Sequence, residues 1–94
     1  MDKDRARQQA LRHLRETVPR FEEEFKIVDD MTKEADWCWV FFWDSRRFLE
    51  TGALEDAIVG NAPIVVDKAS GHVHETGTAL PLEDYLEKLH RQAE

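Results

Sequence analysis

The longest hydrophobic run in the chain covers residues 37–43, seven apolar residues in a row. Most of the seven are aromatic or β-branched, which favours a β-strand. The run is too short for a helix that crosses a bilayer, which needs about 20 residues. Alternate side chains of a strand point to opposite faces. One face is therefore expected to carry Trp37, Trp39, Phe41 and Trp43, and the other Cys38, Val40 and Phe42. Both faces are apolar, so we predict a central strand that is covered on both sides.

Apolar residues at helical spacing mark both ends of the chain. In residues 2–18 they recur at i, i+4 from Ala6 to Val18. Pro19 ends this helix, because proline lacks an N–H and disfavours helical geometry in the residue before it. Near the C-terminus, Pro81 suits the first position of a helix, and apolar residues follow at i, i+3, i+4 and i+7 from Leu82. We therefore expect an N-terminal and a C-terminal helix.

Three shorter segments favour strands, at residues 25–29, 63–67 and 72–76. The turn at 68–71, in which Gly71 can take a positive φ, joins the last two into a hairpin with Val66 opposite Val73. The polar residues 30–36 are expected to form the loop that pairs 25–29 with the aromatic strand. After that strand, Ser45 and Gly52 are expected to cap one helical turn, and residues 53–58 to form a second turn in a long connection.

Together these elements predict an α+β fold. We expect a two-layer sandwich, in which an antiparallel sheet of about four strands packs with the N-terminal and C-terminal helices. Ninety-four residues suffice for one modest core, so residues 1–94 are expected to form a single domain.

Charge is distributed unevenly along the chain, whose formal net charge is −7. Residues 1–20 carry six basic and three acidic groups, whereas residues 21–36 carry two basic and seven acidic groups. An acidic chain repels nucleic-acid phosphates and attracts a basic protein. A solvated surface that aids solubility is the simpler interpretation of the acidic segment. The first twenty residues are charged rather than apolar, which does not match a signal peptide and favours the cytoplasm.

The candidate reactive groups do not assemble into an active site. Strand alternation places Cys38 inside the sheet, and no basic cluster precedes it, which favours a buried structural thiol over a nucleophile. His72 and His74 share a strand face, but two histidines leave a zinc or copper site incomplete. Asp67 opposite His72 could orient an imidazole, but no activated nucleophile or Gly-rich phosphate loop accompanies the pair. We expect no catalytic residue, no metal and no cofactor.

The acidic segment and the aromatic strand are better candidates for contact with another protein. The candidate partner-binding residues are Glu22, Glu23, Glu24, Asp29, Asp30, Trp37 and Trp39. Packing in the core is the alternative use of the aromatic residues. Composition and spacing by themselves therefore predict a small domain that binds rather than catalyses.

A series of short motifs extends over residues 37–90. It begins with Trp39-x-Phe41-x-Trp43 and Phe48-Leu49-Glu50-Thr51-Gly52. It continues with Gly60-Asn61-Ala62-Pro63, Asp67, Ser70-Gly71, Gly77-Thr78 and Pro81-Leu82-Glu83-x-Tyr85. In order and spacing the series resembles the YrhB domain family, which is grouped with bacterial polymorphic-toxin immunity proteins as the immunity protein 35 family. The acidic segment 22–36 is the main departure from that family.

The resemblance implies a small α+β protein without a catalytic centre. One implied role is that of an immunity protein, which binds and neutralises a cognate bacterial toxin. The other is that of a heat-stable, chaperone-like protein. An immunity protein has one tight partner, usually encoded beside it, whereas a holdase has many weak clients. A homodimer is compatible with either role, and neither involves a membrane.

Overall fold

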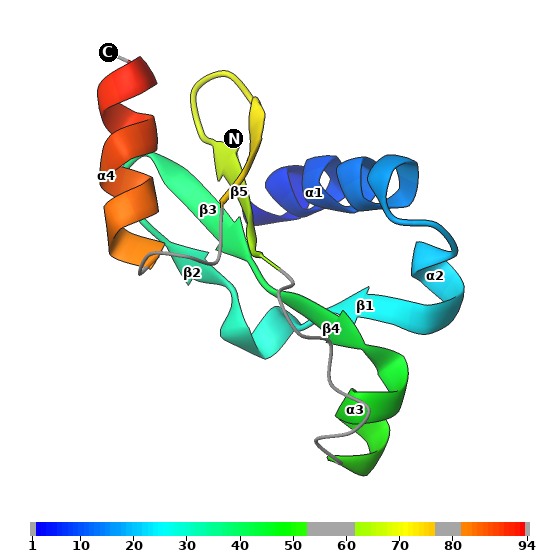
Figure 1. Cartoon of the computed structure of the whole chain (residues 1–94). Helices are drawn as coiled ribbons and strands as arrows, with labels where there is room; N and C mark the ends of the chain where they lie inside the picture. The colour runs from blue at the N-terminus through cyan, green and yellow to red at the C-terminus, as the bar shows by residue number, and fades with distance from the viewer. Residues whose placement is uncertain (1, 53–61, 77–81, 94) are drawn as a thin grey trace.

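Two antiparallel sheets form the framework of the protein (Figure 1). The structure, a computed structural model, describes residues 2–52, 62–76 and 82–93. The larger sheet has the strand order β2 (Lys33–Glu34), β3 (Cys38–Phe41), β5 (Ile64–Asp67), β6 (Val73–Glu75). The smaller sheet pairs β1 (Phe25–Ile27) with β4 (Trp43–Ser45). The sheets are accompanied by α1 (Lys3–Thr17), α2 (Phe21–Glu24), the 3-10 turn η1 (Asp29–Met31), α3 (Arg46–Thr51) and α4 (Leu82–Ala93).

The aromatic run occupies the centre of the larger sheet, as predicted. Its first part, β3, lies between β2 and β5, and Phe41 at its end is fully buried. The run is not one strand, because it breaks at Phe42, whose carbonyl accepts a hydrogen bond from Val28 N (2.8 Å). The chain then continues as β4 in the smaller sheet.

The two faces of the larger sheet are covered by different helices. Ala6, Ala10 and Leu14 of α1 pack against Phe41, Ile64 and Val66 on one face. On the other face Cys38, Val40 and Val65 are buried, and Leu86 of α4 packs against them. Figure 1 shows α1 and α4 on opposite sides of the sheet. The α+β class with antiparallel strands and terminal helices is confirmed, and the separation of the helices adds a third layer to the expected sandwich.

The expected alternation of faces is wrong at one position, Trp37. This residue packs with Cys38 and Val40, on the face opposite Trp39 and Phe41. The physical reason is that residues 36 and 37 form a bend before β3, so the two-residue period of the strand does not extend to Trp37.

The segment 30–36 is more ordered than the simple loop expected from its polar residues. It contains most of η1 and the short strand β2, which pairs with β3. The strand β1 therefore pairs only with the end of the aromatic run, with Phe25 opposite Ser45 and Ile27 opposite Trp43.

The predicted hairpin and helix caps are confirmed. Val66 lies opposite Val73, and Gly71 has a φ of 75°. The Asp67 carboxylate accepts hydrogen bonds from Ser70 N (3.0 Å) and Ala69 N (2.7 Å), and these bonds lower the pKa of Asp67. The Ser45 hydroxyl accepts from Phe48 N (2.9 Å), and Gly52 ends α3 with a φ of 70°. The helical turn predicted at 53–58 and the start of a helix at Pro81 lie outside the described residues.

Candidate partner-binding surface

The three glutamates of the acidic segment project from the short helix α2. Buried Phe21 anchors this helix, and Arg20, in the left-handed region with a φ of 57°, turns the chain into it. Arg20 forms ion pairs with Glu23 (Nε–Oε2 3.0 Å) and Glu24 (Nη1–Oε1 3.7 Å). Arg15 of α1 forms an ion pair with Glu22. Two arginines therefore offset much of the negative charge of α2, although such exposed pairs each stabilise the fold by only about 0–1 kcal/mol.

The two aspartates Asp29 and Asp30 lie in η1 and differ in their surroundings. Asp29 accepts two hydrogen bonds from the Arg7 guanidinium, from Nε (2.7 Å) and Nη2 (3.2 Å). This is the bidentate geometry that makes arginine–carboxylate pairs specific. Asp30 is exposed and has no hydrogen bond or ion pair with any described residue. Of the two, only Asp30 presents an uncompensated carboxylate.

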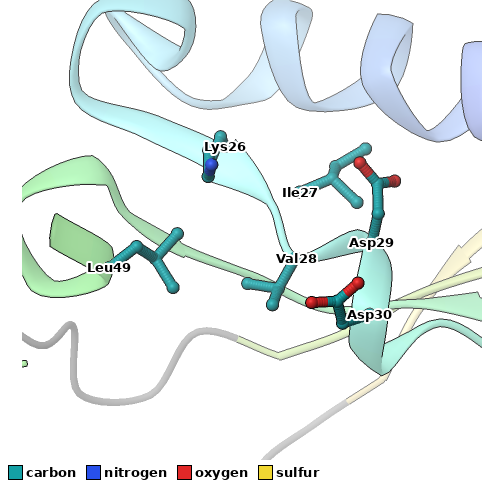
Figure 2. A pocket seen from close by; sticks show the side chains of 6 residues that line it. All are labelled: Lys26, Ile27, Val28, Asp29, Asp30 and Leu49. Carbon is teal, nitrogen blue, oxygen red and sulfur yellow. The ribbon is translucent and has the colours of Figure 1, made fainter.

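A hollow of about 320 Å³ adjoins these aspartates (Figure 2). We call it the η1 hollow; its lining residues are Lys26, Ile27, Val28, Asp29, Asp30 and Leu49. The end of β1 and the start of η1 supply the first five residues, and α3 supplies Leu49 from the other side. The hollow therefore forms where segments distant in sequence meet.

The two candidate tryptophans lie on opposite faces of the larger sheet. Trp37 stacks on the His90 ring of α4, with ring centroids 5.3 Å apart and planes 8° from parallel. Trp39 packs on the α1 face, and the Lys68 ammonium lies 5.2 Å from the centre of its ring. Both side chains are partly buried. The seven candidate residues consequently do not form one continuous patch, and the two tryptophans belong mainly to the packing of the sheet.

The candidate reactive groups are held in structural surroundings. Cys38 is fully buried, and burial raises the pKa of its thiol to about 11, although nearby Lys68 opposes the increase. His72 and His74 have ring centroids 4.5 Å apart, and burial lowers the pKa of His74. Among residues 2–52, 62–76 and 82–93, no three histidine, cysteine or acidic side chains are grouped as a metal site requires. Within the same residues, no helix has the length and apolar character needed to cross a bilayer.

Native Cys38 is expected to react with iodoacetamide far more slowly than the unfolded chain does. The rise in pKa from 9.0 to about 11 lowers the thiolate fraction at neutral pH about 100-fold, and burial blocks access as well. Alkylation rates in buffer and in concentrated urea, followed by mass spectrometry, would measure the difference. Equal rates in the two conditions would contradict a buried thiol.

The same pKa shift predicts a pH dependence of stability. The folded chain holds the Cys38 proton more tightly than the unfolded chain does. The contribution of the protonated Cys38 thiol to the stability of the fold is therefore fully present below pH 9.0 and is lost as the pH rises towards about 11. Comparing the wild type with Cys38→Ala across this range would isolate the contribution, because the variant has no thiol to titrate.

Sequence reasoning missed the partners of the acidic segment. Arg7, Arg15 and Arg20 appear in the sequence only as part of the basic residues 1–20, with no sign of which carboxylates they meet. The opposite charges of residues 1–20 and 21–36 were the available signal, since neighbouring segments of opposite charge attract each other. Val28 and Leu49 carry no comparable signal for the η1 hollow.

Two comparisons connect the chain with known proteins. The family model described as "Immunity protein 35" matches residues 4–88. The protein printed as "Uncharacterized protein YrhB", from Escherichia coli (strain K12), is 51% identical over 49 residues. That match covers 52% of this chain and 52% of the relative, so it spans about half the length of each. No solved structure matches the chain.

Proposed function

Because the family model covers residues 4–88, the chain belongs to the immunity protein 35 family, and we propose that it is a cytoplasmic protein that binds and neutralises a cognate bacterial toxin. The family match is the observation that carries this proposal. Neutralisation here means masking: the protein occupies a surface of the toxin and performs no reaction of its own. The structural surroundings of Cys38, His72 and His74 support a role without catalysis.

The proposed contact surface lies on α2 and η1. Glu22, Glu23, Glu24, Asp29 and Asp30 are exposed there, and the η1 hollow lies beside the aspartates. Exposed charges of this kind influence the rate of association and the choice of partner more than they hold a complex together. Trp37 and Trp39 remain predicted contact residues, and their partial burial limits the access of a partner to them.

The alternative role, a chaperone-like holdase, requires apolar surface for many clients. Among the side chains whose exposure the structure describes (residues 2–52, 62–76, 83–88 and 90), one large hydrophobic residue is exposed, Met31, with 53% of its surface accessible. This observation favours one specific partner over many weak ones.

The proposal predicts that co-expression protects cells from the toxin encoded beside this gene. Purified protein is expected to form a stoichiometric complex with that toxin, measurable by size-exclusion chromatography. As a matched control, the same toxin is co-expressed with the Phe41→Ala variant of this protein, which lacks a buried core side chain. A toxin that kills equally with and without the wild-type protein would contradict an immunity role.

The acidic surface is expected to act mainly on the association rate. Replacing Glu22, Glu23 and Glu24 by glutamine should lower the on-rate for a basic toxin surface and leave the off-rate nearly unchanged. The effect should shrink as salt approaches about 1 M, where the screening length falls to about 3 Å. The control neutralises three exposed carboxylates outside the surface, Asp4, Glu83 and Asp84, and so changes the net charge equally. If both triple variants slow association alike, net charge matters and the α2 surface does not.

A further inference from the structure

Another hollow, of about 300 Å³, lies where α1, α2, β1 and the start of α3 meet. We call it the α1–β1 hollow; its lining residues are Arg7, Leu11, Arg15, Phe21, Glu22, Lys26, Ile27 and Arg46. Four of these residues are cationic and one is acidic, although the whole chain has a formal net charge of −7. The lining is therefore positive on a protein that is acidic as a whole.

The hollow has an apolar floor beside the helix α1. Arg7, Leu11 and Arg15 recur at i, i+4, so they lie on one face of α1. Phe21 and Ile27, each 3% exposed, belong to one buried cluster, and Leu11 packs against that cluster. In Figure 1, α2 connects α1 to β1 at this end of the molecule. An occupant of the hollow therefore has apolar surface to pack against.

The two arginines of α1 already have carboxylate partners. Arg7 pairs with Asp29, and Arg15 pairs with Glu22, the acidic residue of the lining. The other two glutamates of α2 pair with Arg20 and do not line the hollow. The α1 side of the hollow is consequently close to neutral.

The cations of the opposite side, Lys26 and Arg46, have no carboxylate partner of this kind. Arg46 Nε donates to the main-chain carbonyl of Glu22 (2.8 Å), which is a neutral acceptor. Within the described part of the chain, neither side chain forms an ion pair. Asp44 lies opposite Lys26 in the β1–β4 ladder, but its carboxylate accepts a hydrogen bond from Ser45 N (2.7 Å). Both cations are exposed, so they are accessible to an anion from outside.

We propose that the α1–β1 hollow receives a glutamate or aspartate side chain of the partner toxin. Its carboxylate accepts charge-assisted hydrogen bonds from the Arg46 guanidinium and the Lys26 ammonium, and its methylene stem packs against Leu11. The volume of about 300 Å³ accommodates one such side chain. This inference rests on the proposed function for the identity of the partner, whereas the preference for an anion follows from the residues of the hollow.

The hollow adjoins the acidic surface of α2, because Glu22 belongs to both. The contact surface therefore carries charges of both signs. A toxin that fits it presents basic residues to α2 and an acidic residue to the hollow. Such a pattern fixes the orientation of the partner and disfavours proteins whose surface is uniformly basic or uniformly acidic.

Other occupants fit the hollow less well. A cationic side chain meets the like charges of Lys26 and Arg46. A purely apolar side chain covers the Arg46 guanidinium without giving it an acceptor, which costs free energy. A nucleic acid brings a row of phosphates to a chain with a net charge of −7. A free inorganic anion has no stem for the apolar floor, and the first test below includes it.

The first test needs no toxin. N-acetyl-glutamate amide, titrated into the isotope-labelled protein, is expected to shift the NMR signals of Leu11, Lys26 and Arg46 in preference to others. N-acetyl-glutamine amide, which has the same shape without the charge, is expected to leave them unchanged. Inorganic phosphate at the same ionic strength is expected to bind more weakly than the glutamate amide, because it has no apolar stem.

Arg46→Gln should weaken the response to the glutamate amide about tenfold, whereas Arg5→Gln should not. Arg5 is the matched control, because it is an exposed arginine of α1 that lies outside the hollow and changes the net charge equally. Shifts that are absent, scattered or unaffected by Arg46→Gln would overturn the inference. Phosphate that binds as tightly as the glutamate amide would also overturn it, since the hollow would then be a site for a free anion.

The second test uses the toxin and separates this inference from the proposed function. Arg46→Glu is expected to weaken toxin binding by at least about tenfold, and Arg5→Glu to have little effect. Glutamate is well tolerated in the first turn of a helix, so Arg46→Glu should keep the unfolding midpoint of the wild type. Replacing the matching acidic residue of the toxin by lysine should restore binding to Arg46→Glu.

The outcomes of the two tests distinguish the two proposals. If the wild type protects cells and Arg46→Glu protects equally well, the proposed function stands and the hollow is not the contact. If the glutamate amide binds the hollow but the wild type binds no toxin, the preference of the hollow for a carboxylate stands and the proposed function fails.

Discussion

Phe41→Ala is expected to lower the free energy of unfolding by about 3–5 kcal/mol. Phe41 has no accessible surface and belongs to the buried cluster of the α1 face together with Leu14 of α1 and Ile64 and Val66 of β5. Its removal loses the burial of a large side chain and leaves a cavity that a rigid sheet and helix cannot close. At roughly 0.05–0.15 kcal/mol per residue, a domain of this size has only about 5–14 kcal/mol of stability in total. One truncation therefore removes a large part of it.

Urea unfolding followed by tryptophan fluorescence measures this loss as a lower midpoint with an unchanged slope. Met31→Ala is the control, because Met31 is exposed, and it should change stability by no more than about 0.5 kcal/mol. Trp39→Ala should lie between the two, since Trp39 is partly rather than fully buried. A Phe41→Ala variant as stable as Met31→Ala would contradict the assignment of the core.

Leu86→Pro is expected to destabilise the protein by about 3 kcal/mol or more, because proline inside a helix removes a hydrogen bond and clashes with the preceding turn. Leu86 lies within α4 and packs against the buried cluster of Cys38, Val40 and Val65. When α4 no longer covers this face, the thiol of Cys38 should become accessible. The rate of Cys38 alkylation in buffer therefore reports directly on the position of α4.

Lys88→Ala provides the control for Leu86→Pro, since Lys88 is exposed on the same helix and alanine preserves the helix. It should leave both the unfolding midpoint and the alkylation rate close to wild type. If Leu86→Pro likewise left Cys38 protected and the midpoint unchanged, α4 would not be the cover of this face. The unfolding midpoint reports stability, and the alkylation rate reports access to Cys38. Measuring both therefore distinguishes release of α4 from simple loss of helix content.

Where a structural feature depends on neighbouring residues, it could be predicted from the sequence. The hairpin register of Val66 and Val73 follows from a short turn containing Gly71. The caps of α3 depend on the side chain of Ser45 and on the backbone freedom of Gly52, and each acts within one turn of the helix. The alternation along residues 38–43 holds because it is a property of the extended backbone itself.

The candidate surface was predictable only in part. The sequence shows that Asp29 and Asp30 are acidic and lie in a polar segment, which marks them as exposed. It does not show that Asp29 meets Arg7, 22 residues away, while Asp30 meets no described cation. The two aspartates are equivalent in the sequence and differ in the structure because only one of them faces α1.

The α+β class, the central aromatic strand, the terminal helices and the family could all be inferred from the amino-acid sequence, because each depends on periodicity or on residues at short, regular spacing. That α1 and α4 cover opposite faces, and that Trp37 turns towards α4, follows only from the packing of the folded chain. The same packing sets which arginines offset the acidic segment and where Val28 and Leu49 line a hollow. These features depend on how whole elements pack in three dimensions, and the free energy of that packing is shared among many residues distant in the chain.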